Sequence, residues 1–125
     1  MATITEDYVS FETAKFLKEK GFTSEKCYTA YDDNGNFFWY GDYSKDRKNV
    51  IDAPTLQMAM KWLRKVHNLC IVPLPVVTDD DGEGGCLWKY TISMKLKVLF
   101  DSGNLYESLE IASDDAIKHC LENLI

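Results

Sequence analysis

Three stretches of the chain carry apolar residues at the three- and four-residue spacing of an amphipathic helix. The first begins at a favourable cap residue, Ser10, and ends at Gly21, which can adopt the left-handed conformation that closes many helices. The second begins near Thr55 and ends near Asn68, and the third begins after Ser108 and runs to the end of the chain. Each helix has one apolar stripe, so each is expected to cover one side of a sheet.

A β-hairpin is predicted between the first two helices. Residues 27–31 and 36–40 resemble strands, and they flank an Asn-Gly pair at positions 34–35. Asn and Gly tolerate the positive φ of a tight turn, and this pair between apolar runs is the strongest short hairpin signal. The second strand is an unbroken aromatic run at 37–40. Because alternate side chains point to opposite faces, one pair of these rings enters the core and the other pair needs a cover.

Two further strands are predicted between the second and third helices. Residues 69–77 are apolar, but Pro73 and Pro75 cannot donate to a ladder, so this strand lies at a sheet edge or bends away. Residues 87–96 alternate between apolar and polar, which is typical of a strand with one wet face. Residues 97–105 extend this strand or turn.

The element order is therefore α-β-β-α-β-β-α. We expect an α+β fold in which a four-stranded, mainly antiparallel sheet packs with three helices in two layers. The chain of 125 residues fits a single domain covering 1–125, and a domain of this size needs neither a metal nor a disulfide to fold.

Charge and composition narrow the partners and the location. The chain has 14 Lys and Arg residues against 20 Asp and Glu residues, a formal net charge of −6. This sign suits solubility or a basic partner, and nucleic acid is not expected because phosphate binding needs a clustered basic face. No apolar segment is long enough to span a membrane, and residues 1–7 lack the features of a signal peptide. We therefore expect a cytoplasmic protein whose four widely spaced cysteines are reduced.

No motif specifies a cofactor, a metal or a catalytic residue. Phosphate loops, dinucleotide fingerprints and nucleophile elbows are all missing from the sequence. An EF-hand alignment of the acidic loop at 78–85 fails at both terminal ligand positions. His67, Cys70 and Cys120 offer zinc donors without the usual ligand spacing. We therefore expect no cofactor and no metal, and we assign no catalytic residue.

The aromatic hairpin is the best candidate binding surface. Tyr and Trp combine a large contact area with a polar group, which favours them at interfaces. The competing interpretation is that most of these rings pack beneath the helices. The candidate binding residues are Tyr31, Phe38, Trp39, Tyr40 and Tyr43.

Stretches in all three predicted helices resemble a set of small α+β proteins encoded by phages and mobile elements of gut bacteria. The hairpin keeps a similar spacing, whereas the region from Val76 to Tyr106 diverges. The resemblance implies an accessory protein of a mobile genome and carries no catalytic role. The matching stretches are 8–22, 53–68 and 117–125.

These observations leave three hypotheses of different classes. The first is a non-enzymatic protein-binding module of phage or prophage origin, which acts on a host protein in the bacterial cytoplasm. The second is a small-ligand binder or sponge, with a pocket at the aromatic hairpin that a homodimer encloses. The third is a metal-dependent enzyme that uses His67, Cys70 and Cys120.

Overall fold

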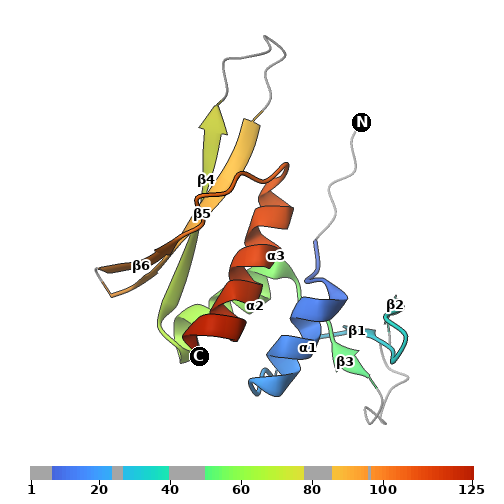
Figure 1. Ribbon diagram of the computed structural model, residues 1–125. Coiled ribbons are helices and arrows are strands. Elements are labelled where there is room, and N and C mark those ends of the chain that lie inside the picture. The colour runs from blue at the N-terminus through green and yellow to red at the C-terminus, as the bar shows by residue number, and fades with distance from the viewer. Residues whose placement is uncertain (1–6, 24–26, 40–49, 78–85, 96) are drawn as a thin grey trace. The chain divides into compact units, whose positions relative to one another are not determined.

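The computed structural model describes residues 7–23, 27–39, 50–77, 86–95 and 97–125 (Figure 1). These residues form three α-helices and six strands, so the chain has an α+β fold as expected. The chain divides into two compact units, Met1–Ala59 and Met60–Ile125, and each is described by itself. Helix α2 (Leu56–Val66) contains the boundary between them. Whether the whole chain behaves as one domain stays a prediction.

Helix α1 (Phe11–Glu19) begins and ends where the sequence indicates. The Ser10 hydroxyl accepts a hydrogen bond from the backbone N–H of Thr13 at 3.3 Å, which satisfies a donor that the first turn leaves open. At the other end, Gly21 has a φ of +87°, and the N–H of Phe22 donates to the carbonyl of Leu17 at 2.9 Å. This pairing closes the helix as in a Schellman motif.

The first unit contains a small antiparallel sheet with β1 (Thr29–Tyr31) in the centre. Strand β2 (Phe37–Trp39) pairs with one side of β1 and β3 (Ile51–Asp52) with the other. The predicted hairpin is therefore confirmed. Its turn is fixed by the side chain of Asp32, whose Oδ1 accepts from two backbone N–H groups at 2.9 Å, and by Gly35 with a φ of +84°.

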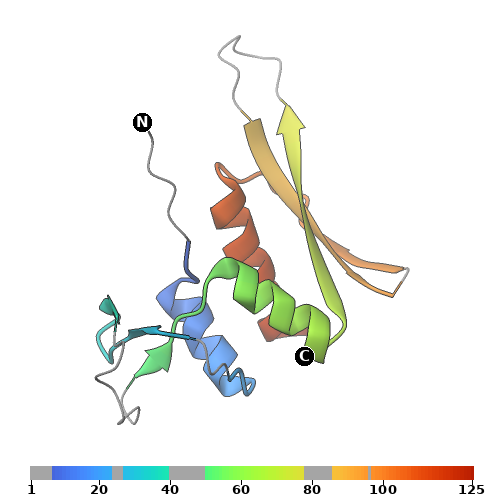
Figure 2. The same cartoon turned by 180° about the vertical axis from the view of Figure 1, so that it is seen from behind.

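The second unit contains a larger antiparallel sheet in the order β4 (Leu69–Val77), β5 (Cys86–Met94), β6 (Lys97–Asp101). Strand β4 is an edge strand, as its two prolines predict. Helix α3 (Leu109–His119) packs against β4 and β5 (Figures 1 and 2), and the last turn of the chain is the π-helical segment η2 (Cys120–Leu124).

Apolar side chains of α3 and β5 form the core of the second unit. Alternation along β5 places Tyr90 and Ile92 on the buried face, at 2% and 0% exposure. From α3 and the following turn, the fully buried apolar side chains are Ala112, Ala116, Ile117, Cys120 and Leu121. Leu124, near the end of the same predicted helix, is half-buried.

The structure differs from the expected single four-stranded sheet. The described strands form two separate three-stranded sheets, and the described elements follow the order α-β-β-β-α-β-β-β-α. The two additional strands are β3 and β6. Strand β3 has two residues, too few to show an alternating pattern, and β6 follows β5 after a turn at Lys95, whose φ is +53°.

Candidate functional site

The aromatic hairpin exposes two of its three described β2 rings. Trp39 is 67% exposed and Phe37 is 40% exposed, whereas Phe38 is half-buried. Tyr31 on β1 is also half-buried, and its hydroxyl donates to the backbone carbonyl of Val9 at 2.6 Å. Tyr31 therefore serves to connect the sheet to the start of α1. The remaining two predicted binding residues, 40 and 43, are outside the described part of the chain.

Tyr8 adds another ring to this surface, from a segment that precedes α1. Its ring centroid lies 4.9 Å from that of Phe37 and 6.1 Å from that of Trp39, and the Tyr8 and Trp39 planes cross at 83°. An antiparallel bridge between Tyr8 and Thr55 holds this segment beside the start of α2. The N–H of Leu56 also donates to the carbonyl of Asp7 at 3.0 Å. The position of Tyr8 is therefore set by backbone hydrogen bonds rather than by contacts of its side chain.

Three aromatic side chains, those of Tyr8, Tyr28 and Trp39, line a hollow of about 110 Å³ at one end of the first sheet. We call it the aromatic socket. It is lined by Tyr8, Cys27, Tyr28, Thr29, Trp39, Pro54, Thr55 and Met58. Tyr28 and Trp39 are exposed, at 52% and 67%, whereas Cys27, Thr29 and Pro54 are buried. The aromatic socket therefore has a buried floor and an exposed aromatic rim formed by Tyr28 and Trp39.

The floor of the aromatic socket is held by internal hydrogen bonds. The Thr29 hydroxyl donates to the carbonyl of Ala53 at 2.6 Å, and the Cys27 thiol donates to the carbonyl of Thr29 at 3.4 Å. Burial raises the pKa of the Cys27 thiol, and the nearby negative charge of Asp52 raises it further. Because the thiolate is the nucleophilic form, this environment disfavours a catalytic role for Cys27.

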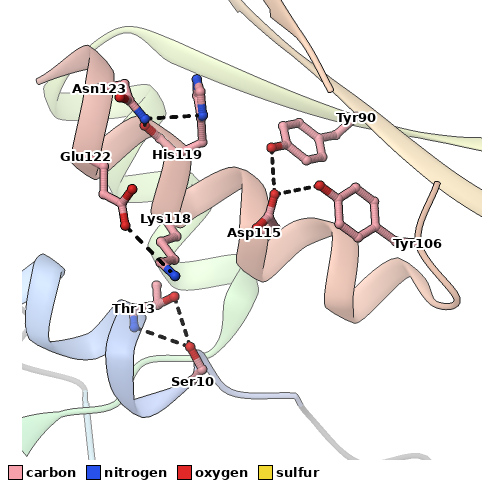
Figure 3. A network of polar contacts seen from close by, with 9 residues as sticks. All are labelled: Ser10, Thr13, Tyr90, Tyr106, Asp115, Lys118, His119, Glu122 and Asn123. Carbon is pink, nitrogen blue, oxygen red and sulfur yellow. Dashed lines mark hydrogen bonds and ion pairs between the residues drawn. The ribbon is translucent and has the colours of Figure 1, made fainter. Parts of the chain in front are cut away.

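A polar cluster in the second unit is a different kind of candidate (Figure 3). Tyr90 and Tyr106 both donate their hydroxyls to Oδ2 of Asp115, at 2.8 and 2.7 Å. The two tyrosine rings stack with centroids 5.7 Å apart, and a bridge pairs Tyr106 with Trp88 on β5. Because Tyr90 is only 2% exposed, its hydroxyl is inaccessible to a substrate, and the cluster serves to fasten α3 to the sheet.

The pKa values of the two tyrosines follow from this arrangement. Burial raises the pKa of Tyr90, and the Asp115 carboxylate raises it further because the phenol donates to a negative group. Burial and then the hydrogen bond to Asp115 likewise raise the pKa of Tyr106. Both phenols therefore stay protonated donors, which suits a structural link and not a general base.

The histidines and cysteines considered as metal ligands are not brought together. Among the described residues, no group of three or more His, Cys, Asp or Glu side chains is arranged to hold a metal ion. Cys70 is exposed, whereas Cys120 is fully buried, and burial raises the pKa of its thiol to about 12. His67 packs against Trp62 with ring centroids 4.8 Å apart, and its Nε2 is buried without a hydrogen-bond partner in the described structure.

Of the residues that line the aromatic socket, sequence reasoning named only Trp39 as a binding residue; Tyr8 and Met58 are among those it missed. Tyr8 precedes the helical pattern and has no periodic signal of its own. Met58 lies in α2, off the stripe formed by Leu56, Ala59 and Leu63, which makes it resemble an ordinary surface position.

Comparisons with protein-family models, curated proteins and solved structures find no match for this chain.

Proposed function

We propose that this chain is a non-enzymatic protein-binding module and that the aromatic socket is its docking surface. The module is of phage or prophage origin and acts on a host protein in the bacterial cytoplasm. No described helix is long and apolar enough to cross a membrane.

The exposure of two aromatic side chains around one hollow carries this proposal. A soluble chain gains little in its own core from Trp39 and Tyr28, which are 67% and 52% exposed. Trp and Tyr are the residue types that dominate binding energy at the centres of interfaces, where they fill or surround pockets. The buried floor at Cys27 and Thr29 keeps the rim in place before a partner binds, which lowers the cost of ordering it.

A pocket for a small ligand is the second candidate function. The volumes of two hollows in the first unit show how large such a ligand could be. The aromatic socket, at about 110 Å³, is well below the range of roughly 300–1,000 Å³ that is usual for ligand sites. A second hollow of about 290 Å³ lies at the end of α1 and includes Lys18, Phe22 and Asp52 in its lining. The aromatic socket thus fits one side chain of a partner better than a whole metabolite.

Site-specific photo-cross-linking in cells tests the docking surface. A photoreactive phenylalanine analogue replaces Trp39 in one variant and Val98 in the control. Val98 lies on β6 and is 61% exposed, so the two probes are similarly accessible. We expect a discrete protein adduct from position 39 and none of the same mass from position 98.

The alternative outcomes are distinguishable by mass spectrometry. Adducts that are equally diffuse from both positions contradict a specific docking surface. If position 39 cross-links to a second copy of this chain, the partner is a homodimer subunit and not a host protein. A large rise in melting temperature with a nucleotide or metabolite, with no adduct, favours the small-ligand alternative, because a ligand of the folded state stabilises it.

A further inference from the structure

The aromatic socket has features of a cation-binding cage, and we propose that it takes the positively charged head of a basic side chain from the partner protein. This inference rests on the proposed function and specifies the chemistry of the docking partner. Its support comes from ring geometry, charge and size.

The rings of the aromatic socket are oriented to surround a small group. The Tyr8 and Trp39 planes are nearly perpendicular, at 83°, with centroids 6.1 Å apart, and Tyr28 contributes to the same lining. Perpendicular rings provide walls in two directions, whereas a parallel stack would close the space between them. A cation within about 6 Å of such ring faces is attracted by their negative quadrupole, and Trp is the strongest partner.

The charges at the aromatic socket favour a cation. The described residues that line it include no Lys, Arg or His and no Asp or Glu, so no charged side chain of the lining repels a cation. Burial is the main reason that the pKa of the Cys27 thiol in the floor is raised, and the negative charge of nearby Asp52 adds to that rise. The whole chain carries a formal net charge of −6, so a positively charged segment is attracted before contact.

The size of the aromatic socket restricts the occupant to one side-chain head. An engineered cavity of about 150 Å³ holds one benzene molecule, so a hollow of about 110 Å³ accommodates a group of roughly four heavy atoms. An alkylated ammonium or a guanidinium has this size. An entire nucleotide or peptide does not, so the rest of a partner lies on the rim formed by Tyr28 and Trp39.

NMR titration of the ¹⁵N-labelled chain separates a cation cage from a plain apolar hollow. The probes are three short peptides of identical sequence that carry lysine, trimethyllysine or the uncharged tert-butyl isostere of trimethyllysine at the central position. Tetramethylammonium ion is the fourth probe. We expect the indole N–H of Trp39 to shift, and the trimethyllysine peptide to bind about 3- to 30-fold more tightly than its uncharged isostere, the range that cation–π attraction supplies.

Substitution of Trp39 tests whether its ring causes the tighter binding of the trimethyllysine peptide than of its uncharged isostere. Trp39→Leu keeps an apolar wall but removes the ring face, so it should reduce binding of the trimethyllysine peptide to the level of the isostere and leave the isostere unchanged. Trp39→Phe should keep part of the preference, and the Val98→Ala control should keep all of it. The amide spectrum of each variant verifies that it is folded.

Each outcome decides between named alternatives. Equal binding of the charged and uncharged peptides overturns the cage but leaves a docking surface that still cross-links through position 39. If tetramethylammonium binds as tightly as the trimethyllysine peptide, the ligand of the aromatic socket is a small free cation and not a protein side chain. Shifts confined to residues away from Tyr8, Tyr28 and Trp39 overturn the cage altogether.

Discussion

Removing the hydroxyl of Tyr90 should destabilise the second unit only while Asp115 is present. In the structure, the Tyr90 hydroxyl donates to Asp115 Oδ2 at 2.8 Å, and Tyr90 is 2% exposed. A hydrogen bond to a charged group contributes about 1.5–3 kcal/mol to the free energy of unfolding. Because Asp115 is half-buried and partly screened, we take the lower end and expect Tyr90→Phe to cost about 1.5 kcal/mol.

Asp115→Ala should cost more than Tyr90→Phe. It removes the acceptor of two hydroxyls and leaves the buried Tyr90 donor without a partner, which adds a desolvation penalty of about 1–3 kcal/mol. We expect a total cost of about 3 kcal/mol. In that background, Tyr90→Phe removes the unsatisfied donor and should cost nothing or restore stability. The double-mutant cycle should therefore give a coupling free energy of at least about 1.5 kcal/mol.

Urea unfolding followed by circular dichroism measures all four free energies of unfolding. Tyr28→Phe is the matched control, because it removes the same hydroxyl from a tyrosine that is 52% exposed, and we expect a change below about 0.5 kcal/mol. If Tyr90→Phe costs the same in both backgrounds, the phenol and the carboxylate act independently and our account of the link between α3 and β5 is wrong.

Three further predictions concern other parts of the molecule. Gly35→Ala should destabilise the chain more than Gly21→Ala in urea unfolding: both have φ near +85°, but only at position 35 would a Cβ lie 3.1 Å from a phenylalanine ring. Stability should fall as pH rises above about 10, because the folded pKa of Tyr90 is raised above its unfolded value, and Tyr90→Phe should reduce this loss. In alkylation followed by peptide mapping, exposed Cys70 should react at once and buried Cys120 only as fast as the chain unfolds.

Each of these has an outcome that would contradict it. Equal costs of the two glycine substitutions would exclude the ring contact as a source of strain. Identical losses of stability at high pH in wild type and Tyr90→Phe would assign the titration to other groups. Rapid alkylation of Cys120 in folded protein would show that α3 opens locally far more often than its burial implies.

The local elements were largely predictable because their signals are local. Ser10 and Ser108 each cap a helix through a side chain that accepts a backbone N–H three residues later. Asn68 has a φ of +58°, which agrees with its predicted role at the end of the second helix. Val66 continues the apolar spacing of that helix in the sequence, but its side chain is 57% exposed.

The grouping of strands was not predictable in the same way. Strand β3 pairs with β1 through its backbone across more than twenty residues of sequence, and no side-chain pattern records which distant strands will pair. A chain that forms two small sheets can therefore have nearly the same hydrophobic pattern as a chain that forms one larger sheet. The predicted edge position of β4 was correct because proline limits backbone donation whatever the partner is.

The sites show the same division between local and distant information. Trp39 was identifiable because an aromatic run is visible in sequence, whereas Tyr8 joins it only through the backbone bridge to Thr55. Asp115 resembles an ordinary solubilising acid on a helix, and only the folded sheet brings Tyr90 within hydrogen-bond distance.

The affinity of the chain for the protein that cross-links through position 39 tests the central claim most directly. Isothermal titration calorimetry of wild type, Trp39→Ala and Val98→Ala with that purified partner compares an aromatic anchor with a similarly exposed residue of the second unit. Loss of an anchor at an interface typically costs about 2 kcal/mol or more, so Trp39→Ala should weaken binding by roughly 30-fold or more while Val98→Ala leaves it unchanged. Equal affinities for all three proteins would show that the aromatic socket is not the docking surface.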